Sequence, residues 1–346
     1  MTQLSSSIYE IRMCKHKELD LLKSFLESSW SKEHIFLRDQ SILDFQHKSS
    51  EGYNFVVAYH KEQNCFHGVL GIISPGFYLN NSISYAEDIW LAIWKVEKKL
   101  AEINSLGMDL LNYVNTRFKP KTISAIGINK TVSILYKFLG YKVKKMRHWF
   151  IPNRHYKEYK IIFGDITEKK IQSSLLTSII YFTNDNRELI NDFFYNDKVK
   201  DSFDYLVNRY IDHPSYEYQI IGICNEANKL IAVCIGREVY GNKSKAFRLM
   251  ELFFEPPDVQ DISRTLDTFM HRNSYEYVDF LEYGFDCKVL EAFGFERCSE
   301  KLYVPHLFEP FVQDRKEVII AFKSQDPFYC TKGDSDLDRP NRINQV

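Results

Sequence analysis

Residues 126–142, IGINKTVSILYKFLGYK, decide the fold because they join a buried strand to a short helix and to a further strand. The run TISAIGI, residues 122–128, is apolar and β-branched, which predicts a strand, while TVSILYKFLG, residues 131–140, has helical spacing. Gly140 follows that helix, at the position where a left-handed backbone commonly ends one. Strand and helix alternating in this way predict an α/β layer.

The residues before this stretch extend the same pattern. DIWLAIWKVE, residues 88–97, is almost continuously apolar and predicts a strand buried on both faces. The turn-like NSLG then opens the apolar-periodic LLNYV of a helix. Strands are also expected at 8–13, 54–60 and 66–74, a helix at 18–30, and a closing strand in VKKMRHWFI, residues 143–151.

The second half of the chain repeats the closing part of this pattern. We expect a hairpin at 218–239, a strand at 247–256, a helix at 261–273 and a strand at 277–284. VLEAFGFER, residues 289–297, aligns with ILYKFLGYK, residues 134–142, when Gly294 is matched to Gly140, so that Leu290 falls on Tyr136 and Phe295 on Tyr141. We therefore predict an internal duplication, with domains at 1–152 and 170–324 and a polar tail at 325–346. The fold class expected is α/β (α+β), as two related lobes, each a mixed, mostly antiparallel sheet flanked by helices.

The composition restricts the classes of partner. The chain has 346 residues and a formal net charge of -1, so it has no net positive charge to attract a polyanion. No nucleic-acid partner is therefore expected. No stretch reaches the roughly 18 apolar residues that a membrane span needs, and the first residues lack a basic leader, so we expect a soluble, cytoplasmic protein. The seven cysteines are scattered singly, which argues against a disulfide framework or a zinc site, and no metal is expected.

Two segments make residues 8–150 resemble the GNAT superfamily of acyl-CoA-dependent acyltransferases. The first is the strand, turn and helix IWLAIWKVEKKLAEINSLGMDLLNYV, residues 89–114, and the second is IGINKTVSILYKFLGYK. The resemblance implies that acyl-CoA is the co-substrate, that free main-chain groups at the strand end bind pantetheine, and that the turn before the helix binds the diphosphate. The cofactor-binding residues it implies are Trp94, Lys95, Val96, Asn104, Ser105, Leu106, Gly107, Met108, Asp109 and Asn129. Gly107 matches the family's middle glycine, whereas Asp109 stands where a small residue is usual.

The resemblance also implies a catalytic residue, Tyr136, four positions before Gly140. In the family this tyrosine often lies beside the thioester sulfur, where its phenol, protonated at neutral pH, can donate a proton to the leaving thiolate. Candidate general bases are His34, which precedes an aromatic-lined helix at 36–45, and also His67 and Glu87. A base is not required, because an amino-sugar nitrogen titrates near neutrality. Each of these residues could equally have a structural role.

At a narrower level the chain resembles tandem-GNAT enzymes of surface-polysaccharide gene clusters. This resemblance rests on three segments: DIWLAIWKV at residues 88–96, HIFLRDQSILDFQH at residues 34–47, and the tail TKGDSDLDRPN at residues 331–341. This resemblance implies acyl transfer to the amine of a nucleotide-activated amino sugar. Acidic and amide side chains of the tail could bind a magnesium ion or sugar hydroxyls, but their spacing is not that of an EF-hand, so no metal site is assigned. Arg339 could bind a nucleotide phosphate, and a solvated tail is the alternative. The substrate-binding candidates are Asp336, Asp338, Arg339 and Asn341.

The second lobe lacks the features of an acyl-CoA site. Leu290 occupies the position of the tyrosine, and EPPDVQDISRTL, residues 255–266, has two prolines and no glycine where the diphosphate turn should be. We expect this degenerate lobe to shape the acceptor site. Two alternatives stay open: an aminoacyl-tRNA-dependent transferase resembling the FemABX enzymes, and a non-enzymatic acyl-CoA-binding module. A homo-oligomer also stays open.

Overall fold

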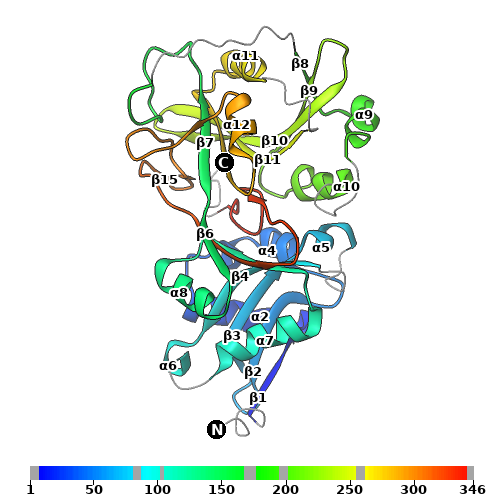
Figure 1. The fold of residues 1–346 in the computed structure, drawn as a ribbon. Coiled ribbons are helices and arrows are strands. Elements are labelled where there is room, and N and C mark those ends of the chain that lie inside the picture. The colour runs from blue at the N-terminus through cyan, green and yellow to red at the C-terminus, as the bar shows by residue number, and fades with distance from the viewer. Residues whose placement is uncertain are drawn as a thin grey trace. The chain divides into compact units, whose positions relative to one another are not determined.

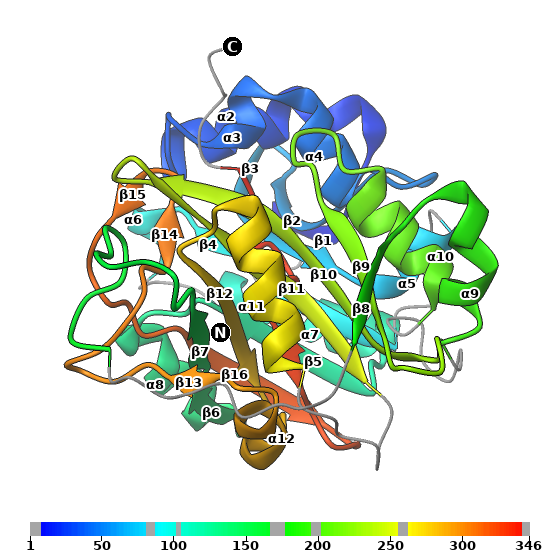
Figure 2. The ribbon, with the colours of Figure 1, turned by 90° about the horizontal axis from the view of Figure 1, so that it is seen from above.

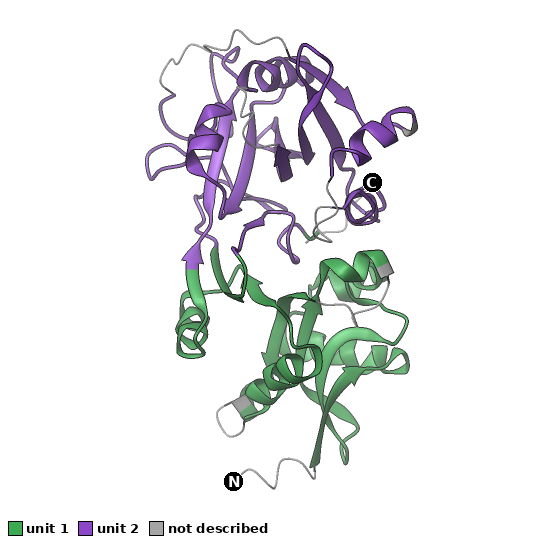
Figure 3. Ribbon diagram, turned by 45° about the vertical axis from the view of Figure 1, so that its right-hand side comes forward, with its two compact units in different colours: residues 1–143, 319–326, 339–346 green, residues 144–318, 327–338 purple. Residues whose placement is uncertain are grey.

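Two mixed sheets with the same order of strands organise the chain. The computed structural model describes residues 8–80, 87–101, 105–166, 177–194, 202–254 and 262–340. It divides into two units: unit 1 comprises residues 1–143, 319–326 and 339–346, and unit 2 comprises residues 144–318 and 327–338 (Figure 3). None of the helices in these described ranges combines the length and apolarity needed to span a membrane.

Unit 1 is built on a seven-stranded sheet with the order β1-β2-β3-β4-β5-β16-β6 (Figure 1). Its strands are β1 (Tyr9–Cys14), β2 (Tyr53–His60), β3 (Cys65–Ile73), β4 (Asp88–Val96), β5 (Thr122–Ile126), β6 (Lys142–Lys145) and β16 (Ile319–Ser324). Its helices are η1 (His16–Glu18), α2 (Leu19–Ser29), α3 (Ile35–Arg38), α4 (Gln40–His47), α5 (Pro75–Asn80), α6 (Lys98–Ala101), α7 (Leu106–Phe118) and α8 (Lys130–Phe138).

The side chains of this sheet alternate between two cores. Val56 and Ala58 of β2 join a cluster with α7 and α8, whereas Phe55 and Val57 join a cluster with α2, α3 and α4. Because successive strand residues point to opposite faces, the two groups of helices cover opposite faces of the sheet. The predicted helix at 36–45 is in fact two helices, because Asp39 adopts an extended backbone and its carboxylate caps α4 by accepting from Ser41 N at 2.9 Å.

Unit 2 has the corresponding order β8-β9-β10-β11-β12-β7-β13, with β17 paired to β12 outside this path. Its strands are β7 (Arg147–Pro152), β8 (Ser178–Tyr181), β9 (Gln219–Cys224), β10 (Leu230–Gly241), β11 (Ser244–Phe254), β12 (Tyr277–Tyr283), β13 (Glu296–Arg297), β14 (Leu307–Phe308), β15 (Phe311–Val312) and β17 (Cys330–Thr331). Its helices are η3 (Asn184–Asn186), α9 (Arg187–Asn191), α10 (Phe203–Leu206), η5 (Val207–Ile211), α11 (Ser263–Asn273) and α12 (Cys287–Ala292). Helix α11 lies across the sheet and buries Leu266, Phe269 and Met270 in its core (Figure 2).

Each sheet takes its sixth strand from the opposite half of the sequence. The predicted closing strand at 143–151 is wrong as a single element, because it breaks at Met146 into β6 and β7, which belong to different sheets. Strand β16 lies between β5 and β6 in the sheet of unit 1. The expected domain ranges put β7 in the first domain and β16 in the second, whereas the two units of the structure contain them the other way round.

The internal repeat extends to the ends of helices α8 and α12. Both are followed by a glycine with positive φ, +79° at Gly140 and +89° at Gly294. In both, the residue after the glycine donates its N–H to a carbonyl oxygen five positions back, at 2.9 Å in α8 and 3.0 Å in α12. Both helices therefore end in the same motif. The equivalent residues are those paired when Gly294 was aligned with Gly140, so Leu290 occupies the position of Tyr136.

Candidate functional site

Strands β4 and β5 separate soon after they start. They pair in parallel at only three positions, the last of which joins Trp90 to Ser124. Beyond this point β4 continues to Val96 beside β3, while Ala125 and Ile126 of β5 pair with β16. The two strands therefore splay, and β4 has no strand on the β5 side over its second half among the described residues.

A β-bulge and the alternation of the backbone decide which groups face this splay. The pairing of β4 with β3 shifts register between Trp94 and Leu91, which places an extra residue in β4. Farther along, Glu97 N donates to His67 O at 2.9 Å and so points toward β3. Since backbone groups alternate along a strand, we infer that the N–H groups of Trp94 and Val96 point to the splayed side.

The first turn of α7 packs against the same end of β4. The indole Nε1 of Trp94 donates to Gly107 O at 3.2 Å. A Cβ built on Gly107 would lie 3.6 Å from Val96 and 3.7 Å from the Trp94 indole. Ser105 occupies the N-cap but its hydroxyl bonds to Asp109 Oδ2 at 2.8 Å instead of capping the backbone. The predicted turn therefore places the positive end of a helix dipole beside the splay.

The ring of Tyr136 also contacts the Trp94 indole. Its ring meets Trp94 edge to face, with centroids 5.8 Å apart, and meets Tyr141 at 4.9 Å. Tyr136 is buried, and its hydroxyl has no hydrogen-bond partner within the described residues. Burial, and to a smaller extent Tyr141, raise the pKa of Tyr136, so its phenol stays protonated at neutral pH. Trp94 thus contacts both the turn that was predicted to bind diphosphate and the predicted acid, an arrangement that sequence reasoning missed because it considered only the main chain of Trp94.

Some predicted site residues cap helices. Asn129 accepts from Val132 N at 2.8 Å as the N-cap of α8. His34 caps α3, where its Nδ1 accepts from Phe36 N at 3.4 Å, and its ring packs edge to face on Phe36. Because α3 and α8 belong to opposite faces of the sheet, the structure does not group His34 with Tyr136.

The other candidate bases lie elsewhere in unit 1. Nδ1 of His67 is 2.8 Å from the hydroxyl of Tyr9, and burial lowers the pKa of this imidazole. His67 lines a cavity of about 600 Å³ together with Lys95, whose side chain points to the α2 face, away from Trp94. Glu87 is exposed and pairs with Lys121 at 2.8 Å.

Residues 327–338 of the acidic tail belong to unit 2. Both carboxylate oxygens of Asp338 accept from the buried Arg237, at 2.8 and 3.0 Å, and Tyr218 donates to it at 2.7 Å. Arg339 belongs to unit 1 and lies 5.1 Å from the ring centroid of Phe36, while Asp336 is half-buried. Asn104 and Asn341, also predicted as site residues, lie outside the described residues.

Metal ligands do not gather in the described ranges. No group of three or more His, Cys, Asp or Glu side chains there is arranged so that it could hold a metal ion.

Comparison with known proteins identifies the fold. No protein-family model and no curated protein matches the sequence. A GCN5-related N-acetyltransferase from Anabaena variabilis has a TM-score of 0.51 and 14% identity, covering 91% of this chain and 72% of its own. A protein from Enterococcus faecalis V583 described as a probable N-acyltransferase has a TM-score of 0.52 and 10% identity, covering 90% and 72%. The chain has a GNAT-like α/β fold in two lobes, which confirms the predicted fold class.

Proposed function

We propose that unit 1 binds acyl-CoA in the splay between β4 and β5 and transfers the acyl group to an amine. The observation that carries this proposal is the geometry around Trp94, which contacts Gly107 at the helix turn and Tyr136 at the splay. A strand edge with free main-chain groups, a helix N-terminus and a buried acid are the three things that a thioester donor requires.

The main chain of unit 1 would hold the donor. The first turn of α7, with Ser105, Leu106, Gly107, Met108 and Asp109, offers the positive end of the helix dipole to the diphosphate. The N–H groups of Trp94 and Val96 face the splay and suit the pantetheine amides and the thioester oxygen. In this arrangement an oxyanion formed at the thioester carbonyl receives a hydrogen bond from β4.

The reaction is attack of a neutral amine on the thioester carbonyl. The new C–N bond forms a tetrahedral intermediate, and its collapse breaks the C–S bond. Tyr136 donates its proton to the departing sulfur, and the proton lost by the nitrogen replenishes the phenol through solvent. The products are an amide and free CoA thiol, so protons and electrons balance without a further reactant.

The acceptor that we propose is a nucleotide-activated amino sugar. The support is the narrower sequence resemblance, carried by residues 34–47, 88–96 and 331–341. Of the predicted substrate-binding side chains, Asp338 has both oxygens occupied by Arg237, which leaves Asp336 and Arg339 as the described candidates. A general base is not part of this proposal, because an amino-sugar nitrogen is substantially neutral near pH 7.

The decisive experiment titrates the protein with CoA and compares acetyl transfer in two variants. Tyr136→Phe should keep CoA affinity and lower kcat by about 100-fold, the usual contribution of a positioned acid. Tyr141→Phe is the matched control, since it removes a phenol from the same buried pair and should leave kcat within about twofold.

A CoA titration with neither heat nor a thermal shift would contradict the proposal. So would equal kcat values for the two tyrosine variants. Assays with dTDP- and UDP-linked amino sugars against acetyl-CoA, run beside an aminoacyl-tRNA donor, test the acceptor and separate the two alternatives raised by the sequence.

A further inference from the structure

Unit 2 contains a second splay at the position equivalent to the first. Strands β11 and β12 pair in parallel at three positions, the last of which joins Leu249 to Phe280. The pairing of β10 with β11 shifts register next to this point, between Ile235 and Gly236, just as β3 with β4 does in unit 1. Beyond it β11 continues to Phe254 and β12 to Tyr283 without pairing to each other.

Residues 328–338, here called the plug segment, fill this second splay. Its strand β17 pairs with β12, joining Thr331 to Glu282 and Cys330 to Tyr283. The opposite edge of β12 is taken by β7, which pairs with Glu282 through Arg147, so β17 lies on the β11 side. The hydroxyl of Thr331 also donates to Glu251 Oε2 of β11 at 3.0 Å. The plug segment therefore contacts both diverging strands.

A glycine lets the plug segment pass close to side chains of η5 and β11. A Cβ on Gly333 would lie 2.0 Å from the hydroxyl oxygen of Tyr210 and 3.0 Å from Glu251 Oε1. These two groups are fixed, because Tyr210 donates to the same carboxylate oxygen at 2.7 Å. The buried Arg209 donates to Gly333 O at 3.2 Å. Any side chain at this position would need the surrounding residues to move.

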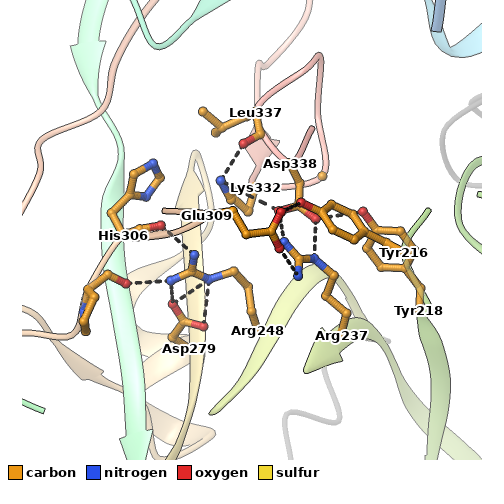
Figure 4. Close-up of polar contacts among 12 residues, drawn as sticks. Tyr216, Tyr218, Arg237, Arg248, Asp279, His306, Glu309, Lys332, Leu337 and Asp338 are labelled. Carbon is orange, nitrogen blue, oxygen red and sulfur yellow. Dashed lines mark hydrogen bonds and ion pairs between the residues drawn. The ribbon is translucent and has the colours of Figure 1, made fainter. Parts of the chain in front are cut away.

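The end of the plug segment is anchored by buried charges (Figure 4). Asp338 receives two hydrogen bonds from Arg237 and one from Tyr218. Lys332 is also buried, and its Nζ donates to Leu337 O at 2.5 Å, which closes the segment into a loop. Because an uncompensated buried charge is expensive, Arg237 favours a state in which the carboxylate is in place.

We infer that the second splay is a peptide-binding groove and that the plug segment is its intramolecular ligand. Recognition combines strand addition to β12 with side-chain pockets, as in other grooves that bind extended peptides. The groove selects a small hydroxyl residue at 331, no side chain at 333 and a carboxylate at 338. Among the described residues of unit 1 no strand pairs with β4 at the equivalent place, whereas unit 2 fills it with residues 328–338.

The test displaces the plug segment in the full-length protein and supplies it again as a peptide. Gly333→Ala should expel the segment, and amide hydrogen exchange over 328–338 should rise by about tenfold to a hundredfold, as overpacking of a close-packed site implies. Adding Tyr210→Phe removes the oxygen that a Cβ would meet, so the double variant should regain much of the protection. A labelled peptide FYCTKGDSDLD should bind the Gly333→Ala protein and not the wild type. The same peptide carrying alanine for glycine should bind neither.

Unchanged exchange in Gly333→Ala, or a wild-type peptide that binds both proteins equally or neither, would overturn the inference. If Gly333→Ala does not fold, Thr331→Val provides a milder test, because it keeps the shape and removes the bond to Glu251. We then expect amide hydrogen exchange to rise by about fivefold in residues 328–338 and to stay unchanged in α11. Unchanged exchange over 328–338 in this variant would also overturn the inference. None of these readouts uses acyl-CoA, so their outcome is independent of the proposed function.

Discussion

Individual polar residues that the sequence proposed for the site have structural roles that can be tested apart from chemistry. His34 and Asn129 both stand before a helix and accept a hydrogen bond from its first turn. Such a position needs only a short acceptor, which several residue types supply. From sequence alone, a histidine or asparagine before a helix can therefore be either a helix cap or a site residue. A variant that keeps the capping hydrogen bond but removes the acid-base group separates these two roles.

The variant His34→Asn tests the role of this imidazole. Asparagine keeps the acceptor for Phe36 N and removes any acid-base group, so we expect stability within about 1 kcal/mol of the wild type and an acyl-transfer rate close to normal. The sequence raised His34 as a candidate general base, and the rate tests that expectation, because removing a base should cost about 100-fold or more. The measurements are kcat against pH and the midpoint of urea unfolding.

Lys332 should make the stability of the protein depend on pH. Burial lowers the pKa of this ammonium from 10.5 to about 7. The unfolded chain then binds more protons than the folded one between these two values, so the contribution of Lys332 to the free energy of unfolding rises with pH from about 7 to 10.5. The slope is at most about 1.4 kcal/mol per pH unit.

Lys332→Met isolates this contribution, since it keeps the length of the side chain without the charge. Urea unfolding at pH 7 and pH 9 should show the wild type gaining stability relative to the variant as the pH rises. Two parallel pH dependences would show that this lysine titrates normally in the folded protein.

At the scale of elements, helix α7 combines a favourable dipole with an unfavourable charge. Asp109 lies in its first turn and stabilises the helix through the dipole, and it accepts a hydrogen bond from Ser105. The same carboxylate would repel the diphosphate proposed to bind there. The departure from the family pattern at this position therefore has a physical consequence for affinity.

Asp109→Asn should tighten CoA binding by about threefold to tenfold at low ionic strength, and high salt should reduce the difference. Binding of acetyl-pantetheine, which has no diphosphate, is the control and should not change. An equal effect on both ligands, or none on CoA, would show that the first turn of α7 does not face the diphosphate. Isothermal titration calorimetry at two salt concentrations measures both.

Elements that are positioned by residues close in sequence could be predicted, whereas those positioned by residues far apart in sequence could not. Gly107 and Tyr136 could be expected near one another because both follow strands of a recognisable local pattern. The separation of β6 from β7 could not be expected, since a break at Met146 is invisible in a sequence that continues to alternate. The plug segment was expected to be a polar tail, because charges such as Asp338 normally indicate solvent, and their partner Arg237 lies about 100 positions away.

At the scale of the whole molecule, the exchanged strands make each unit depend on both halves of the sequence. Strand β16 pairs with β5 over five residues, from Ile320 with Ile126 to Ser324 with Thr122. Without it the sheet of unit 1 would expose the edges of β5 and β6, and exposed edges favour association. A cut at the predicted domain boundary therefore removes an internal strand from each unit.

Fragment 1–152 should accordingly fail to fold as a monomer, and co-expression with fragment 153–346 should restore a folded complex. A fragment 153–315, which lacks β16, should not restore it. Dispersed ¹H–¹⁵N NMR signals and size-exclusion chromatography report on both. A well-dispersed monomeric spectrum from 1–152 alone would mean that β16 is dispensable to unit 1.

The late position of β16 also affects how the protein is made. Translation starts at the N-terminal end, so β5 and β6 are synthesised long before residues 319–324, which form the strand between them. Domains usually fold in the order in which they are synthesised. Here the sheet of unit 1 stays incomplete until residues 319–324 have been synthesised, so chaperone protection of the growing polypeptide should matter more than for a protein whose halves fold in turn.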